Sequence, residues 1–142
     1  MAPRADTRQP LCVLLVEDSA EVRRALRAQV EEIPNVRVIG TAGDAETAIE
    51  FIRSLRPDVV LLDLRLSRSS GLTVLVAAQV LVTPPRIVVL TNDSEPRIRE
   101  HCLALGALEC LDKATEFDRA LALLRRWSAD LLAPTLRGPP EE

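Results

Sequence analysis

Reactive side chains follow four short apolar runs in this sequence, each at the point where the run ends. They are three carboxylates, a hydroxyl and an ammonium group, carried by Glu17, Asp18, Asp63, Thr91 and Lys113. Lys113 is the only lysine among 18 lysine and arginine residues. A lysine ammonium is a compact charge that fits against one oxyanion, whereas an arginine guanidinium is a wide planar fork. The combination favours a site that binds a small, highly charged anion.

Three carboxylates in one crevice repel one another unless a cation joins them. Two unit charges about 4 Å apart interact with about 4 kcal/mol at an effective dielectric constant of about 20. Mg²⁺ relieves this repulsion and is usually held by a few carboxylates, waters and a phosphate group. With Mg²⁺ on Asp18 and Asp63, a phosphoryl group at Asp63 would meet the metal on one side and Lys113 and Thr91 on another. An aspartate can itself accept a phosphoryl group as a covalent nucleophile.

The apolar runs predict the strands of a parallel sheet. Each is short, continuous and bounded by polar residues, as in strands buried on both faces. Longer segments with helical spacing separate them, and this alternation favours a sheet covered by helices. Ligands bind outside the carboxyl ends of the strands in such sheets, where the reactive residues stand. The predicted strands are 11–16, 36–41, 58–62, 86–91 and 109–111, and the predicted helices are 20–33, 45–55, 72–82, 96–105 and 116–132.

Two further local features are predicted. Residues 64–70 are expected to form a loop between the third strand and the third helix. Three arginines of the first helix, Arg23, Arg24 and Arg27, lie off its apolar stripe and are expected to face solvent.

Composition, net charge and apolar segments narrow the classes of protein to which this sequence could belong. A hydrophobic content of 47% with 2% aromatic residues indicates a globular protein with an aliphatic core. The net charge of −3 gives no electrostatic reason to expect direct nucleic-acid binding. No apolar stretch approaches the roughly 18 residues of a membrane span, and residues 1–10 lack the apolar core of a secretion signal. The cysteines, three in number and without CxxC spacing, are expected to be reduced thiols of a cytoplasmic protein.

The sequence resembles a response-regulator receiver domain of two-component signalling over about residues 11–132. The motifs that carry the resemblance are Val16-Glu17-Asp18, Leu61-Leu62-Asp63-Leu64, Ser70-Gly71-Leu72, Val89-Leu90-Thr91 and Asp112-Lys113. The resemblance implies a flavodoxin-like, doubly wound α/β fold with five parallel strands in the order 2-1-3-4-5 and five helices. Residues 1–10 are expected to be a flexible leader and 133–142 a disordered tail, so a stand-alone receiver is expected.

The same resemblance implies a role for each reactive residue. Asp63 is the phospho-acceptor, and Thr91 and Lys113 bind the phosphoryl group. Mg²⁺ is the implied cofactor, and its implied protein ligands are Glu17 (mainly through water), Asp18, Asp63 and the backbone carbonyl of Arg65. A sensor histidine kinase or a phosphotransfer protein would supply the phosphoryl group. An unknown downstream protein would read the state, mostly through the fourth helix, fifth strand and fifth helix, and pairing of two chains stays open.

Two residues depart from the family pattern. Receivers usually carry Tyr, Phe or His as a switch three residues before the lysine, and Cys110 is too small to fill the space of such a ring. Proline usually follows the lysine, but Ala114 does so here, which predicts either a strained cis bond or a trans loop of different shape.

Arg65 and Asp93 occupy the positions that tune the lifetime of the phosphorylated state in the family.

Three other functions are alternatives. A degenerate receiver that acts as a scaffold without phosphorylation would keep the same residues. A small phosphatase of the haloacid dehalogenase type, with Asp63 as nucleophile, would need an acid where Arg65 stands. A flavodoxin-like FMN-binding protein would need a hydroxyl-rich or glycine-rich loop after the first strand, where Glu17 and Asp18 would repel its phosphate.

Overall fold

A five-stranded parallel sheet forms the centre of the computed structural model, which describes residues 9–93 and 95–132. Its strands lie in the order β2-β1-β3-β6-β7, which is the predicted order 2-1-3-4-5 of the long strands. Their bounds are β1 Leu11–Val16, β2 Val36–Ala42, β3 Val59–Leu62, β6 Arg86–Thr91 and β7 Glu109–Asp112. Most of the expected leader (residues 1–8) and the whole expected tail (133–142) lie outside the described residues.

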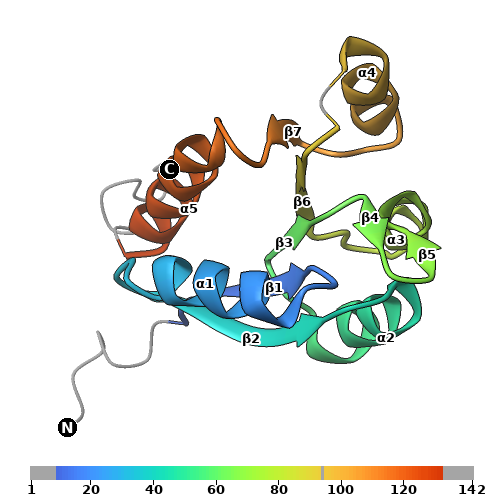
Figure 1. Cartoon of the computed structure of the whole chain (residues 1–142). Helices are drawn as coiled ribbons and strands as arrows, with labels where there is room; N and C mark the ends of the chain where they lie inside the picture. Colours follow the sequence, from blue (N-terminus) through green and yellow to red (C-terminus); the bar gives the residue numbers. More distant parts are fainter. Residues whose placement is uncertain (1–8, 94, 133–142) are drawn as a thin grey trace, which may run out of the picture.

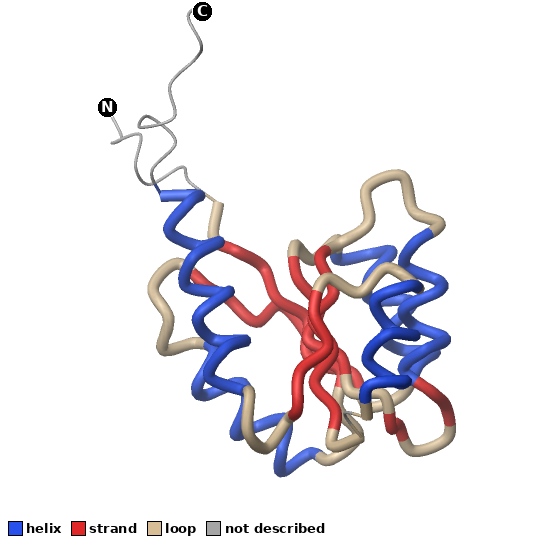
Figure 2. Tube along the Cα trace, turned by 90° about the horizontal axis from the view of Figure 1, so that it is seen from above, coloured by secondary structure: helices blue, strands red, loops and turns tan. Residues whose placement is uncertain are grey.

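Helices cover both faces of this sheet, as Figure 2 shows with the strands between two layers of helix. The first and last helices pack on one face and the other three on the opposite face (Figure 1). Their bounds are α1 Ala20–Val30, α2 Ala45–Leu55, α3 Gly71–Gln79, α4 Pro96–Ala104 and α5 Phe117–Leu132. Within the described ranges, no helix combines the length and the apolar character needed to cross a membrane.

Alternating side chains of the strands divide the core into two clusters. In β1, Val13 and Leu15 face α1 and α5, whereas Leu14 and Val16 face α2 and α3. All four are at most 1% exposed. Burying one such aliphatic side chain stabilises a fold by about 1.5–3 kcal/mol. The continuous apolar runs of the sequence therefore follow from strands that are buried on both faces.

The structure corrects the predicted loop 64–70. This segment holds a short antiparallel hairpin, made of β4 Arg65–Leu66 and β5 Ser69–Ser70. Leu66 is buried and anchors the hairpin to the core. Strands of two residues are too short to show an alternating pattern in the sequence, which is why the hairpin escaped prediction.

Two helices end earlier than predicted, and prolines explain both differences. The first helix ends at Val30 rather than near 33, and a turn in which Ile33 N donates to Val30 O precedes Pro34. The third ends at Gln79 rather than near 82, before the two prolines that precede β6. A residue before proline disfavours the helical conformation, so each helix closes within a few residues of its proline.

Candidate functional site

Three carboxylates meet at the carboxyl ends of β1 and β3. The two strands are neighbours, with Val16 paired to Leu62, so the residues that follow them are placed side by side. One ligand atom from each of Glu17, Asp18 and Asp63 lies within 4.8 Å of the others. Glu17 and Asp63 are buried, whereas Asp18 is exposed. The structure thus brings the predicted acidic residues into one cluster.

Lys113 joins this cluster from the loop after β7. Its Nζ atom donates to Glu17 Oε1 at 2.6 Å and to Asp63 Oδ2 at 2.8 Å. Burial disfavours the ammonium charge, but the bonds to Asp63 and Glu17 outweigh burial and raise the pKa of Lys113. The pKa of Glu17 is also raised, because burial of its carboxylate outweighs the attraction of Lys113. Lys113 therefore stays charged, bridges the two buried carboxylates and offsets one unit of their negative charge.

Thr91 lies at the end of β6 and is linked to the Lys113 loop through the backbone. Its carbonyl accepts from Lys113 N at 2.9 Å, and its Oγ1 accepts from Asp93 N at 3.1 Å. The residue is 1% exposed. The structure therefore places Thr91 and Lys113 in adjacent, bonded loops at the same edge of the sheet.

The backbone of Arg65 contacts the Asp63 carboxylate. Its amide donates to Asp63 Oδ1 at 3.1 Å, so both oxygens of Asp63 accept a hydrogen bond. The Arg65 side chain is exposed and that of Asp93 is partly buried. In the part of the chain that the structure describes, no ion pair joins Arg65 to Asp93.

Two residues that sequence reasoning did not assign to the site support the turn after β1. Ser19 N donates to Glu17 Oε2 at 3.1 Å, while Ser19 Oγ accepts from Val22 N and caps α1. Arg23 Nη1 donates to the backbone carbonyl of Glu17 at 2.6 Å. The prediction that Arg23 belongs to a solvated face was therefore wrong, although Arg24 is exposed as predicted. Helical spacing places Arg23 beside the apolar stripe, and only the path of the turn brings it to Glu17.

Gly71 allows the start of α3 to pass close to the backbone of Asp63. A Cβ atom at Gly71 would lie 2.3 Å from Asp63 O and 2.8 Å from Leu64 Cα. Gly71 N donates to Leu64 O at 2.8 Å, and Ser70 Oγ accepts from Leu72 N to cap α3. The glycine of the Ser-Gly-Leu motif thus has a steric reason, because the start of α3 touches the backbone of Asp63 and Leu64.

Cys110 at the switch position is buried beside a second thiol, that of Cys102 in α4. Burial, with the neighbouring Cys110, raises the pKa of Cys102 to about 12. The cysteines are free thiols, as predicted. No peptide bond is cis in residues 9–93 and 95–132, so of the two alternatives for the bond before Ala114 the structure has the trans form.

The acidic cluster fits a hard divalent cation. Carboxylate oxygens are the ligands that Mg²⁺ prefers, and a few of them with waters and a phosphate group are its usual shell. Asp18, Asp63 and, through water, Glu17 would hold the ion. Asp18 is exposed, so the cluster is open to solvent on its side.

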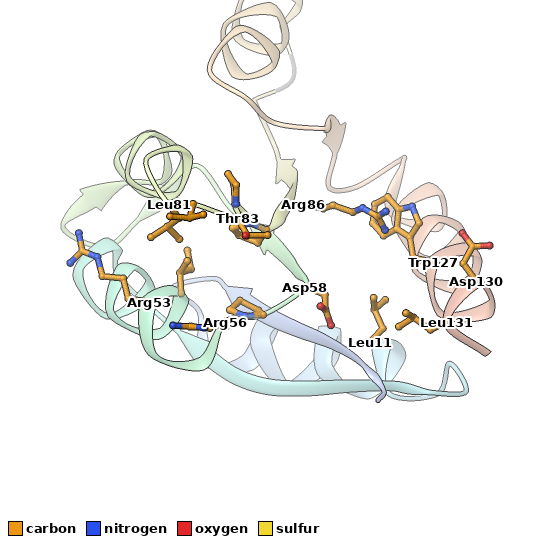
Figure 3. A pocket seen from close by; sticks show the side chains of 15 residues that line it. Leu11, Arg53, Arg56, Asp58, Leu81, Thr83, Arg86, Trp127, Asp130 and Leu131 are labelled. Carbon is orange, nitrogen blue, oxygen red and sulfur yellow. The ribbon is translucent and has the colours of Figure 1, made fainter. Parts of the chain in front are cut away.

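A separate groove lies at the opposite end of the sheet, where β1, β3 and β6 begin (Figure 3). Its volume is about 920 Å³, and its lining includes Leu11, Asp58, Arg86 and Trp127. The Arg86 guanidinium stacks 4.6 Å from the centre of the Trp127 ring. None of the residues of the acidic cluster lines this groove.

Comparison with known proteins agrees with this geometry. The model of the response regulator receiver domain matches residues 13–125. A protein-glutamate methylesterase/protein-glutamine glutaminase of Geobacter sulfurreducens is 38% identical over 104 residues, 73% of this chain and 28% of that protein. Another of Myxococcus xanthus is 34% identical over 141 residues, 93% of this chain and 40% of that protein. The chain spans about a third of the length of these relatives.

Solved structures share the fold. A chain in the crystal structure of the CheX-CheY-BeF3-Mg+2 complex from Borrelia burgdorferi matches with a TM-score of 0.71 and 28% identity, over 87% of this chain and 92% of that chain. The response regulator domain of Thermotoga maritima CheB matches with a TM-score of 0.73 and 24% identity, over 87% and 97% of the two chains. With the family match over residues 13–125, these likenesses lead to one conclusion: the chain belongs to the response regulator receiver domain family.

Proposed function

We propose that this protein is a phosphorylation-dependent signalling switch in which Asp63 accepts a phosphoryl group in the presence of Mg²⁺. The observation that carries the proposal is the environment of Asp63, a buried carboxylate with Lys113 Nζ 2.8 Å from Oδ2 and two further carboxylates beside it. A histidine kinase or a phosphotransfer protein is the proposed donor. The phosphorylated state would be relayed to a downstream protein through contacts between proteins in the cytoplasm.

Each residue of the site would have its own role in phosphoryl transfer. An oxygen of Asp63 attacks phosphorus, the bond from phosphorus to the donor atom breaks, and an aspartyl phosphate forms. Bound Mg²⁺ would offset the negative charge of the phosphoryl oxygens and of the carboxylates. Lys113 is already protonated and placed to turn from Asp63 Oδ2 to a phosphoryl oxygen, and the Thr91 hydroxyl can donate to another.

The proposal assigns no other catalytic activity to this domain. Phosphotransfer from the donor and slow loss of the phosphoryl group to water are the only reactions that it includes. The activity named for the curated relatives belongs to proteins about three times as long as the matched region. A scaffold that never becomes phosphorylated remains the alternative, and the labelling experiment below separates the two.

Replacing Asp63 with Asn tests the acceptor. Incubation with Mg²⁺ and acetyl phosphate should add one phosphoryl group to the wild-type protein, measured by intact mass. Asp63→Asn should abolish the added mass and keep the fold, measured by circular dichroism. Asp118→Asn is the matched control, because Asp118 is an exposed carboxylate at the start of α5. Labelling that persists in Asp63→Asn, or a wild-type protein that takes no label, would contradict the proposal.

Arg65 and Asp93 are proposed to control how long the phosphoryl group persists. Both stand two residues beyond a site residue, Asp63 or Thr91, where side chains can limit the approach of water. A long cation and a short acid could pair across the mouth of the site once a phosphoryl group is bound. We expect Arg65→Ala and Asp93→Ala each to shorten the half-life of the aspartyl phosphate several-fold, measured as decay of the labelled mass. Equal half-lives in the wild type and both variants would show that other groups set the lifetime.

A further inference from the structure

The peptide that joins Glu17 to Asp18 is held by a side chain from α1. Arg23 Nη1 donates to the carbonyl oxygen of Glu17 at 2.6 Å. Glu17 is 3% exposed, and a buried carbonyl needs a donor. Because this carbonyl belongs to the Glu17–Asp18 peptide, the bond restrains the plane of that peptide and hence the backbone position of Asp18.

Gly43, in the loop between β2 and α2, lies against the same peptide. A Cβ atom at Gly43 would lie 3.0 Å from Arg23 Nη1, and 3.8 Å from both Asp18 Cα and Glu17 O. The contacts at 3.8 Å are ordinary, whereas 3.0 Å is tight, so the end of the Arg23 side chain would have to shift by a few tenths of an ångström. The missing side chain of Gly43 therefore leaves the space in which the Arg23 guanidinium reaches the carbonyl.

Asp18 depends on this backbone restraint more than the other two carboxylates do. Glu17 and Asp63 are buried, and Lys113 bonds to both, whereas Asp18 is exposed. An aspartate has a short side chain, so the direction of its carboxylate follows from the position of its backbone. A restraint on the Glu17–Asp18 peptide is therefore a restraint on where Asp18 offers its oxygens.

We propose that Arg23 is a positioning residue that orients Asp18 for metal binding, and that Gly43 provides the clearance it needs. The inference rests on the proposed function, because it takes the acidic cluster to be the Mg²⁺ site. It assigns a role to a residue that touches neither the metal nor the phosphoryl group.

The direction in which Mg²⁺ affinity changes when Arg23 is replaced distinguishes this positioning role from a simple electrostatic effect. The positive charge of Arg23 repels Mg²⁺, so removal of the charge alone would strengthen Mg²⁺ binding. Loss of orientation would weaken it, as loss of a partner that orients a metal ligand commonly does by about tenfold or more. Arg23→Gln should therefore weaken Mg²⁺ binding about tenfold, measured by isothermal titration calorimetry.

Arg24→Gln is the matched control. Arg24 is the next residue of α1, it is exposed, and its substitution removes the same charge. We expect its Mg²⁺ affinity to equal that of the wild type or to rise slightly. The same weakening in Arg24→Gln as in Arg23→Gln would overturn the proposal, and so would an Arg23→Gln variant that binds Mg²⁺ as tightly as the wild type.

Gly43→Ala tests the contact between Arg23 and the Glu17 carbonyl without removing a charge. The added methyl group should displace the flexible end of Arg23 and weaken Mg²⁺ binding several-fold. In the Arg23→Gln background, Gly43→Ala should add little, because the contact it disturbs is already lost. Full additivity of the two effects would contradict the proposal.

Hydrogen exchange in the metal-free protein gives a readout independent of Mg²⁺. Exchange over residues 16–20 should be faster in Arg23→Gln than in Arg24→Gln, and unchanged exchange would overturn the inference. A wild-type protein that binds neither Mg²⁺ nor beryllofluoride would instead defeat the proposed function. Normal wild-type binding with an unaffected Arg23→Gln variant would defeat the positioning role alone.

Discussion

At the scale of single residues, Lys113 is the group on which the site depends most. Among the described residues, it is the only cation that pairs with the carboxylates of Glu17 and Asp63. Oxygen atoms of these two carboxylates lie within 4.8 Å of each other, close enough to share a metal ion. Without Lys113 or a metal ion, two buried negative charges would repel in a medium of reduced dielectric constant. In the metal-free protein, Lys113 therefore supplies the positive charge that Mg²⁺ would otherwise provide.

Lys113→Ala should destabilise the metal-free protein strongly. Removing one partner of a buried ion pair costs about 3–5 kcal/mol, because the remaining charge is left uncompensated. Mg²⁺ should restore more stability to this variant than it adds to the wild type, since it neutralises the same carboxylates. Urea denaturation with and without Mg²⁺ measures both effects. Arg119→Ala is the control, because its pair with Glu109 is largely exposed and should contribute about 0–1 kcal/mol.

The stabilisation by Lys113 should also depend on pH in the alkaline range. The pKa of Lys113 is raised above its ordinary value of 10.5, because its bonds to Asp63 and Glu17 outweigh the effect of burial. The folded state then holds this proton more tightly than the unfolded state does. The contribution is complete below the unfolded pKa and is lost as the pH rises through the folded pKa. The difference in stability between the wild type and Lys113→Ala should therefore shrink above about pH 10.5, and a constant difference would show that the ion pairs contribute nothing.

At the scale of elements, the junction between β3 and α3 is built around close backbone contact. The β4–β5 hairpin begins two residues after Asp63 and returns the chain so that Gly71 N donates to Leu64 O. Ser69 Oγ also accepts from Ala45 N, which ties the hairpin to the start of α2. The loop that follows Asp63 is thus held from both α2 and α3.

Gly71→Ala should disturb this junction. The new methyl group would lie 2.3 Å from Asp63 O, a backbone atom that cannot move aside cheaply. We expect a loss of about 1–3 kcal/mol in unfolding free energy and slower phosphorylation of Asp63. Gly40→Ala is the control, because its nearest contact, 3.2 Å away, is the mobile end of the Leu55 side chain. Equal stability and equal labelling rates for the two variants would show that the junction tolerates the clash.

The helix α4 is the element that we expect to move on activation. It buries a single residue, Cys102, and Arg99 joins it to Glu116 in the loop before α5. Cys110, beneath α4, has no ring that could rotate, so the signal must use another route. Amide exchange with and without beryllofluoride should change most from Thr91 through α4. A change centred on residues 108–112, with the Thr91 loop unaffected, would show that the signal passes through β7 instead.

At the scale of the whole molecule, the acidic cluster and the groove beside Trp127 lie at opposite ends of the sheet. The acidic cluster lies at the carboxyl ends of the strands, and the groove that contains Trp127 lies where they begin (Figure 3). Two aliphatic core clusters fill the faces between these ends. Close-packed cores of this kind keep the two ends in a fixed relation. The loops at the carboxyl ends of the strands can therefore change conformation while the sheet itself stays unchanged.

The sequence by itself determined the five strands of the main sheet, their order through the family resemblance, and which side chains stand at the reactive edge. It could do so because strands buried on both faces are continuous apolar runs, and parallel strands must end at one edge. The Asp44 cap of α2 was predictable for a similar reason, since its carboxylate accepts from Thr47 N within one turn. Apolar runs and helix caps can be predicted because each involves residues that are close together in the sequence.

Only the tertiary structure decided which of those side chains touch. The bonds from Lys113 to Glu17 and Asp63 join residues 96 and 50 positions apart, and they depend on strand register and on the path of the last loop. The turn of Arg23 toward Glu17, the clearance at Gly43 and the close passage at Gly71 depend on where loops cross. No periodicity in the sequence encodes such crossings, because each is set by two segments that meet only after the sheet has formed.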